Sequence, residues 1–322
     1  MWARLAAHGA LLLGKTNMDE LGCGGSAAAL AAGLASMALG SDTSGSLRIP
    51  ASFCGVAAFR PSTAGGPRSY PTQGIVPLTA VFDTPGPMAR SVADLVLLHQ
   101  AITGQAVQPI VSPPRLGVAR RGLFDDLHAG IAGAIDGALA RWQASGATLV
   151  EIDLHDLAAE AIDLQKAVGG ASRLADVLRV MAERSVGRPA QALIDAIETP
   201  SVQRYFAPPP AEAVAAVPTL LKRLDALADE LAARLRTARV SLFTYPTTRH
   251  PPARLDAGDA VLDTNYYGDN ARLAPALGIP ACGFVCARDA NGLPIAGANL
   301  EVAGPRGADS RVLAASLWLD GC

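Results

Sequence analysis

Residues 40–50 read Gly40-Ser41-Asp42-Thr43-Ser44-Gly45-Ser46-Leu47-Arg48-Ile49-Pro50, and this stretch decides which fold we expect for the 322-residue chain. It follows a short apolar run at 36–39 that predicts a β-strand, and it leads into a short helix from about Leu47 that we expect Pro50 to break. A turn of Gly, Ser and Asp between a strand and a helix presents backbone N–H groups without bulky neighbours. Such a turn can hold an oxyanion, and the serine at its end, Ser46, can be a nucleophile. The alternative is a tight turn whose hydroxyl groups cap the next helix.

On both sides of this turn, predicted strands alternate with predicted helices. Helices are expected at 2–8, 26–34, 91–103 and 128–145, and strands at 10–13, 115–120, 148–152, 241–245, 281–287 and 296–303. This alternation favours an α/β fold, with a mixed or parallel sheet covered by helices. The section 154–240 is mostly helical, and we expect it to form an insertion or lid within a single domain that spans 1–322. The proline-rich segment 65–86 is expected to be a loop.

The composition excludes several classes of protein. Hydrophobic residues make up 50% of the chain and charged residues 17%, which is enough apolar material for a folded core. The net charge of −2 argues against a nucleic-acid-binding surface, and the longest nearly uncharged apolar run, 27–40, is too short for a membrane span. The amino-terminal segment lacks the features of a secretory signal. The five cysteines form no C-x-x-C pair, so free thiols in the cytoplasm are expected: Cys23, Cys54, Cys282, Cys286 and Cys322.

Other catalytic and binding motifs are weak or absent in the sequence. Gly9-x-x-x-x-Gly14-Lys15-Thr16 matches the pattern of a phosphate-binding loop, but its interior predicts a strand and no helix former follows it directly. Nucleotide binding is therefore not expected. There is no G-x-S-x-G serine motif, no H-E-x-x-H motif and no histidine or cysteine cluster with metal-ligand spacing. We therefore expect no metal and no other cofactor.

The turn belongs to a longer set of motifs. GGSAAALAAG at 24–33 precedes LGSDTSGSLRIPASFCGVAAFRPS at 39–62, and together they resemble the signature of the amidase signature family. The resemblance continues in five further segments: 9–20, 72–98, 241–248, 277–284 and 292–313. The sequence RSYPTQGIVP…DTPGPMARSVADL most resembles the corresponding motifs of indoleacetamide and mandelamide hydrolases. The resemblance implies the amidase signature fold, a mixed β-sheet covered by helices on both faces, in an incomplete form.

The resemblance also implies a mechanism. Members of the family hydrolyse amides with a Ser–cis-Ser–Lys triad and no metal: the serine attacks the amide carbon, ammonia or an amine leaves, and water cleaves the acyl-enzyme. This chemistry needs a desolvated lysine with a lowered pKa, and N–H donors aimed at the oxyanion. Ser46 stands at the position of the nucleophile. The resemblance also assigns backbone oxyanion donors and charged supports of the loop, which are Thr43, Ser44 and Gly45, and Asp42 and Arg48.

Two members of the triad are missing from the matched positions. The family's cis-serine position, 24 residues before the nucleophile, is occupied by Gly22, with Cys23 beside it. The family's catalytic lysine lies upstream of every segment matched here, so we expect a chain that is truncated at its N-terminus. A further internal deletion is expected between Glu20 and the helix that begins near Ser26. Lys15 belongs to a different segment of the family and is not the equivalent base.

The sequence thus supports two hypotheses on function. One is an amidase-type hydrolase that cleaves a small carboxamide through an acyl-enzyme on Ser46. The resemblance to indoleacetamide and mandelamide hydrolases suggests an aryl-acetamide as this substrate. The other is a catalytically inactive amidase scaffold, because loss of a triad member leaves only slow residual catalysis. Lys15 is considered as a substitute base, whereas Lys166 and Lys222 are expected on solvated helix faces. Lost strands would leave an exposed sheet edge, so self-association is expected in addition to binding of the small-molecule amide.

Overall fold

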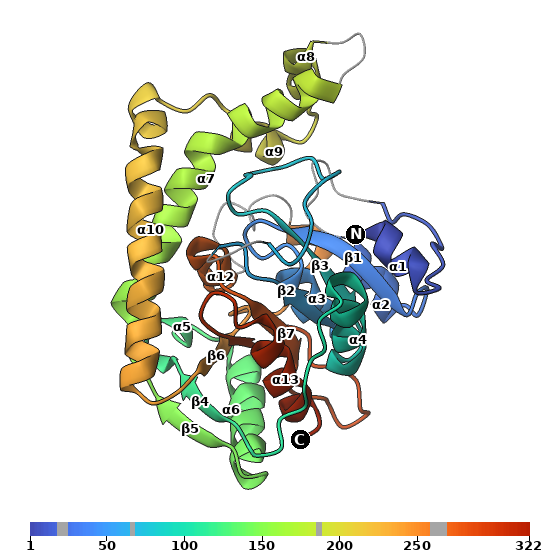
Figure 1. Ribbon diagram of the computed structural model, residues 1–322, viewed down its shortest axis with the longest axis vertical. Helices are drawn as coiled ribbons and strands as arrows, with labels where there is room; N and C mark the ends of the chain where they lie inside the picture. The colour runs from blue at the N-terminus through green and yellow to red at the C-terminus, as the bar shows by residue number, and fades with distance from the viewer. Residues whose placement is uncertain (18–24, 65–67, 185–188, 258–268) are drawn as a thin grey trace.

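A mixed β-sheet runs through the centre of the protein (Figure 1). The computed structural model describes residues 1–17, 25–64, 68–184, 189–257 and 269–322. Within these ranges eight strands form one sheet in the order β1-β3-β2-β7-β8-β6-β4-β5. Their bounds are β1 (Met37–Asp42), β2 (Ala57–Arg60), β3 (Thr84–Ala89), β4 (Arg115–Val118), β5 (Thr148–Glu151), β6 (Leu242–Pro246), β7 (Ala281–Val285) and β8 (Asn299–Ala303). β4 pairs in parallel with β5 and β6, and the other pairs are antiparallel, so the predicted mixed α/β fold is confirmed.

Helices cover both faces of this sheet. They are α1 (Trp2–Ala7), α2 (Ser26–Ala31), α3 (Arg48–Cys54), α4 (Val92–Thr103), α5 (Arg120–Leu123), α6 (Ala129–Ala144), α7 (His155–Arg184), α8 (Ala190–Asp195), α9 (Pro200–Tyr205), α10 (Ala211–Thr237), α12 (Leu273–Leu277) and α13 (Asp309–Asp320). Side chains of a strand alternate between its faces. On β6, Leu242 packs with α4, α6 and α13, whereas Phe243 and Tyr245 pack with α7, α10 and α12. A 3₁₀ turn, η2 (Asn270–Arg272), precedes α12.

The helix-rich middle of the chain consists mainly of two long helices. α7 and α10 run side by side and extend beyond the sheet, with α8 and α9 beside the far end of α7 (Figure 1). Near the sheet, Ala158 and Ala161 of α7 and Leu231 of α10 are buried in one cluster with Phe243 of β6. The middle section therefore shares a core with the sheet, while its role as an insertion or lid stays a prediction.

Several local expectations differ from the structure. The predicted strand at 10–13 has no regular structure, and Leu11, Leu12 and Leu13 are 85%, 62% and 75% exposed, because no strand in the described part of the chain pairs with them. Pro50 does not break α3, which continues to Cys54. It stands in the first helical turn, where a backbone N–H has no helical acceptor and its loss is harmless.

The segment expected to be a loop ends in a strand. β3 pairs with β1 along its whole length, with Pro85 opposite Ser41 and Pro87 opposite Leu39. On its other side β3 pairs with β2 only at Ala89 and Met88. The prolines therefore stand where the ladder to β2 needs no donor from them.

In the described ranges no helix has the length and apolarity needed to cross a bilayer.

Candidate active site

One buried carboxylate fixes the loop that carries Ser46. This loop joins the end of β1 to the start of α3, and Asp42 is the last residue of the strand. Asp42 Oδ1 accepts a hydrogen bond from the Gly45 N–H at 2.9 Å, and Oδ2 accepts one from the Leu47 N–H at 3.3 Å. The residues before and after Ser46 are thus held by the same side chain. Gly45 has φ +116°, and a Cβ there would lie 2.6 Å from Cβ of Ala271, so the turn requires glycine.

Arg48 holds this carboxylate from the side of α3. Its Nε and Nη2 donate to Asp42 at 3.1 and 3.2 Å, and its Nη1 donates to Glu301 Oε2 at 2.6 Å. Nη2 also donates to the carbonyl of Ala271 at 2.6 Å. The hydroxyl of Tyr245 donates to the same Glu301 oxygen at 2.8 Å. One guanidinium thereby ties α3 to β1, β8 and η2, and Tyr245 links β6 to the same Glu301 carboxylate.

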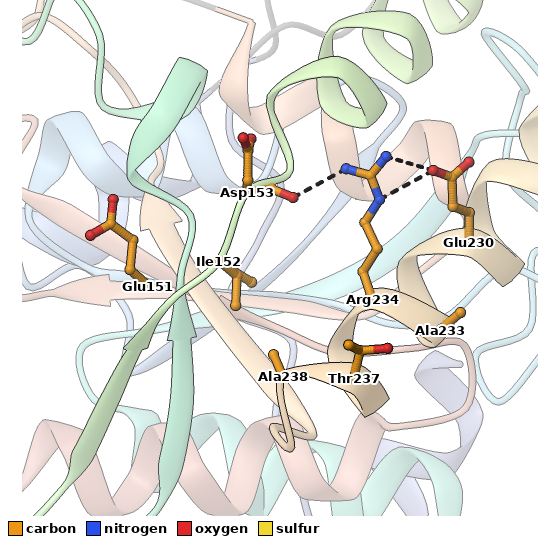
Figure 2. A pocket seen from close by; sticks show the side chains of 8 residues that line it. All are labelled: Glu151, Ile152, Asp153, Glu230, Ala233, Arg234, Thr237 and Ala238. Carbon is orange, nitrogen blue, oxygen red and sulfur yellow. Dashed lines mark hydrogen bonds and ion pairs between the residues drawn. The ribbon is translucent and has the colours of Figure 1, made fainter.

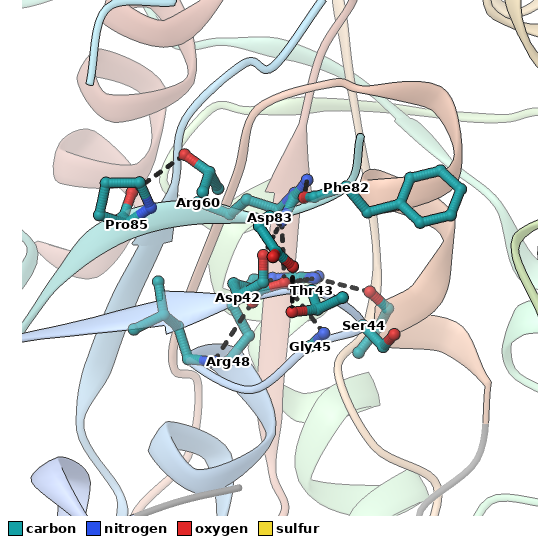
Figure 3. Close-up of polar contacts among 12 residues, drawn as sticks. Asp42, Thr43, Ser44, Gly45, Arg48, Arg60, Phe82, Asp83 and Pro85 are labelled. Carbon is teal, nitrogen blue, oxygen red and sulfur yellow. Dashed lines mark hydrogen bonds and ion pairs between the residues drawn. The ribbon is translucent and has the colours of Figure 1, made fainter. Parts of the chain in front are cut away.

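Arg60 holds the carboxylate from the side of β2. Its Nη1 donates to Asp42 Oδ1 at 3.0 Å and to the Asp42 carbonyl at 2.6 Å, and its Nη2 donates to the Phe82 carbonyl at 2.7 Å (Figure 3). The four charged side chains Asp42, Arg48, Arg60 and Glu301 are fully buried. Two carboxylates therefore face two guanidinium groups, and the network is balanced in charge if all four are ionised.

The two carboxyl groups of this network differ in their environment. Burial alone would raise the pKa of Asp42, but Arg48 and Arg60 outweigh it and hold that pKa below its ordinary value. Burial raises the pKa of Glu301, which has a single guanidinium partner and one oxygen, Oε1, without a hydrogen-bond partner in the described structure. Burial would lower the pKa of Arg48, but its two carboxylates raise it. Asp42 is thus firmly ionised, and Glu301 is the more easily protonated acid.

A second set of contacts holds the other side of the loop. Gln165 of α7, which is 2% exposed, donates from Nε2 to Ser44 Oγ at 2.8 Å and to the Thr43 carbonyl at 3.4 Å. The Thr43 hydroxyl donates to the carboxylate of Asp83, which also accepts the N–H groups of Leu78 and Thr79. The loop is therefore connected both to the helical middle section and to the segment before β3.

The hydroxyl of Ser46 and several backbone N–H groups of its loop are free to contact a substrate. It is half-buried, and its hydroxyl makes no hydrogen bond to any residue that the structure describes. The backbone N–H groups of Thr43, Ser44 and Ser46 are likewise without an acceptor within the described ranges. Gly45 differs from the expectation, because its N–H is taken by Asp42. The candidate oxyanion donors are therefore the N–H groups of Thr43, Ser44 and Ser46.

The lysines do not join this site in the described structure. Lys166 Nζ forms an ion pair with Asp269, and Lys222 is exposed on α10. Lys15 is exposed in the irregular segment before Ser26. None of the three has a hydrogen bond with Ser46. Gly22, at the family's cis-serine position, lies outside the described residues, as does Cys23.

Four residues of the site were not found from the sequence. Arg60 and Glu301 stand within apolar strands, and a charged residue at a buried strand position is a signal of a paired group. Gln165 and Asp83 carry no comparable signal, because their roles depend on partners more than 35 residues away along the chain.

Two other candidate sites lie apart from Ser46. Residues 9–17 contain no strand or helix, and the residues that follow the motif, 18–24, lie outside the described part of the chain. A hollow of about 420 Å³ lies between β5 and α10, where Arg234 bonds the Asp153 carbonyl and Glu230 (Figure 2). β5 is the edge strand opposite β1, so this hollow is at the other end of the sheet.

Known proteins are similar to this chain in sequence and fold. The family model described as Amidase matches residues 22–313. A glutamyl-tRNA(Gln) amidotransferase subunit from Thermus thermophilus is 31% identical over 372 aligned residues, which cover 98% of this chain and 76% of that protein. An indoleacetamide hydrolase from Allorhizobium ampelinum is 40% identical over 137 residues, or 42% of this chain and 29% of that protein. A solved structure described as an amidase superposes with a TM-score of 0.80 at 25% identity, covering 99% of this chain and 76% of that one.

The aligned stretch of 372 residues is longer than the 322-residue chain, so the amidotransferase protein has internal residues with no counterpart here. The family match spans the loop of Ser46, the buried charge network and the late strands of the sheet. With the mixed sheet and its helices on both faces, these findings show that the chain belongs to the amidase signature family.

Proposed function

We propose that the protein is an amidase-type hydrolase that cleaves a small carboxamide with Ser46 as the nucleophile. The observation that carries this proposal is the geometry of the loop. Ser46 is half-buried, its hydroxyl has no hydrogen-bond partner among the described residues, and Asp42 holds the backbone on both sides of it. A nucleophile in a fixed loop next to unoccupied N–H donors is the arrangement that acyl transfer requires.

The proposed reaction has two steps. Ser46 Oγ loses its proton and attacks the carbonyl carbon, and the N–H groups of Thr43, Ser44 and Ser46 stabilise the negative oxygen of the tetrahedral intermediate. The carbon–nitrogen bond then breaks, and ammonia or an amine leaves with the proton that Ser46 gave up. Water attacks the resulting ester, the carboxylic acid leaves, and the Ser46 hydroxyl is restored.

The second candidate is a catalytically inactive amidase scaffold. The observation that favours it is the placement of the lysines, since Lys166 is paired with Asp269 and neither Lys15 nor Lys222 bonds Ser46 in the described structure. Without a proton acceptor the loop retains only binding and oxyanion stabilisation, and such remnants are slower by orders of magnitude than an intact triad.

A fluorophosphonate probe separates the two candidates. We expect the folded protein to be labelled on Ser46 and Ser46→Ala to lose the label. Ser41→Ala is the matched control, because Ser41 is exposed on the same strand–loop segment and should not affect labelling. Lys15→Met tests the substitute base, which would slow labelling if Lys15 accepts the proton. A folded sample that is not labelled and hydrolyses no amide would support the inactive scaffold.

A further inference from the structure

Cationic side chains gather beside the loop of Ser46, around residues 269–272. We propose that Arg272, held by Gln165 and Asp269, binds a carboxylate on the substrate, so that the preferred substrate is a small amide that also carries an acidic group. This inference rests on the proposed function, because the carboxylate is assigned to the substrate of the proposed reaction. The binding of a carboxylate by Arg272 can be tested independently of catalysis.

The segment 269–272 packs directly against the loop. The Ala271 carbonyl accepts a hydrogen bond from Arg48 Nη2 at 2.6 Å. A Cβ on Gly45 would lie 2.6 Å from the Cβ of Ala271, so the two backbones are in close contact. Arg272 is the next residue along the chain. Its side chain therefore begins one residue from the atoms that pack against Gly45, the neighbour of Ser46.

Gln165 directs the Arg272 side chain toward the loop. The amide of Gln165 donates to Ser44 Oγ at 2.8 Å and accepts from Arg272 Nη1 at 3.0 Å. Since the oxygen and nitrogen of one amide are close together, Arg272 Nη1 lies no more than about 8 Å from Ser44 Oγ. This bound places the Arg272 guanidinium within the length of a short acyl chain of the Ser44 side chain, two residues before Ser46.

The guanidinium of Arg272 is fixed and still has donors to offer. Its Nε donates to Asp269 Oδ1 at 3.1 Å, so contacts at Nε and Nη1 define the plane of the group. Its Nη2 makes no hydrogen bond to the residues that the structure describes, and the side chain is 23% exposed. A preorganised guanidinium with open N–H donors is the group that binds carboxylates best among protein side chains.

Charge around the segment 269–272 favours an anion. Lys166 pairs with the other oxygen of Asp269, and Arg249 Nε donates to Asn270 Oδ1 at 3.2 Å. In the described contacts, two cationic side chains, Lys166 and Arg272, therefore share the carboxylate of Asp269, and Arg249 lies beside them at Asn270. An acidic substrate gains from these cations, whereas a neutral aryl-acetamide gains nothing from them.

The test compares ligands that differ in charge. Isothermal titration of the purified protein with succinate, succinamide and indole-3-acetamide should show that succinate binds at least about tenfold more tightly than either neutral amide. Arg272→Gln should weaken succinate binding by about ten- to a hundredfold and leave the neutral amides unchanged. Arg120→Gln is the matched control, because Arg120 is also paired with one aspartate, Asp136, on the surface. It should bind succinate as the unaltered protein does.

A purely structural role for Arg272 predicts a different pattern. It would weaken all ligands together and lower the unfolding temperature without changing the preference between succinate and succinamide. Equal binding of succinate by Arg272→Gln, or equal binding of succinate and succinamide by the unaltered protein, would overturn the inference. Fluorophosphonate labelling of Ser46 in Arg272→Gln serves as the check on the loop. Failure of labelling in the unaltered protein refutes the proposed function, while Arg272-dependent succinate binding would still stand.

If amides are turned over, kinetics give a further test. Succinamate and butanamide have the same reacting group and differ in the terminal acid. Arg272→Gln should raise KM for succinamate with little change in kcat, and should leave both constants for butanamide unchanged. An equal effect on both amides would contradict the assignment.

Discussion

Replacing Asp42 by asparagine removes one charge from the centre of the buried network and almost no volume. Five N–H donors converge on this carboxylate, from the backbone of Gly45 and Leu47 and from the guanidinium groups of Arg48 and Arg60. An asparagine offers one acceptor oxygen, so its amide NH₂ must face donors on the other side. Glu301 is then the one remaining carboxylate of this four-residue network, and it bonds Arg48 alone, so Arg60 keeps no carboxylate partner within the network.

The expected cost follows from burial. All four charged groups are fully buried, and removal of one partner from a buried ion pair typically costs about 3–5 kcal/mol of unfolding free energy. Because the pKa of Asp42 lies below its ordinary value of 3.8, its stabilising contribution is present above that pH and is lost as the pH falls through the lowered pKa. Asp42→Asn should therefore lose stability at neutral pH, and its deficit should shrink in strong acid.

Urea unfolding followed by circular dichroism measures this cost. Asp136→Asn is the control, since Asp136 pairs with Arg120 at 3.0 Å on the surface and such pairs contribute less than about 1 kcal/mol. Labelling of Ser46 by the fluorophosphonate should slow in Asp42→Asn, because the loop loses the acceptor for Gly45 and Leu47. An unfolding free energy for Asp42→Asn within about 1 kcal/mol of the control variant would refute the account of the network.

Three further outcomes are expected. Gly45→Ala should destabilise the fold by about 1–3 kcal/mol and reduce Ser46 labelling, because the new Cβ would clash with Ala271. Gly74→Ala is the control and should cost less, since Gly74 has φ +91° but open space around it. Equal urea midpoints for the two variants would contradict this expectation. Burial raises the pKa of Glu301 above its ordinary 4.5, so this carboxyl group stays protonated to a higher pH in the folded state than in the unfolded state. The unaltered protein should therefore lose stability relative to Glu301→Gln as the pH rises from 4.5 through the raised pKa. A difference in unfolding free energy that does not change with pH would count against this expectation. The edge of β1 opposite β3 pairs with no strand in the described ranges, so sedimentation velocity should show concentration-dependent association, and a monomer at every concentration would contradict this expectation.

The sequence predicts the local elements well where a local cause determines them. Ser91 caps α4 by accepting the Asp94 N–H at 3.2 Å, as a serine before an amphipathic run should. The alternating pattern of apolar segments was sufficient for the α/β class and for most strands. β3 was not predicted, because Pro85 and Pro87 argue against a strand. They are tolerated because β2 pairs with β3 only at Met88 and Ala89, so the ladder to β2 needs no donor from the prolines.

Long-range contacts account for the rest of the site. Asp42 and Arg48 are six residues apart, and the resemblance to a family marked both as supports of the loop. Their partners Arg60 and Glu301 meet them only because β2, β7 and β8 are adjacent in the sheet. The segment 10–13 shows the reverse case, since its apolar composition predicts a strand but a strand needs a neighbour for its hydrogen bonds.

The two sides of the Ser46 loop are built from different kinds of contact, and this difference has a functional consequence. On the side of the sheet, buried charges hold Asp42, so any loosening there exposes an unpaired charge and is costly. On the side of α7, a neutral amide, Gln165, joins Ser44 to the partly exposed Arg272. Contacts of this second kind can be exchanged at small cost in stability. Changes to Arg48 or Arg60 should therefore lower stability and Ser46 labelling together, whereas changes to Arg272 should alter which ligands bind while the fold and the labelling persist.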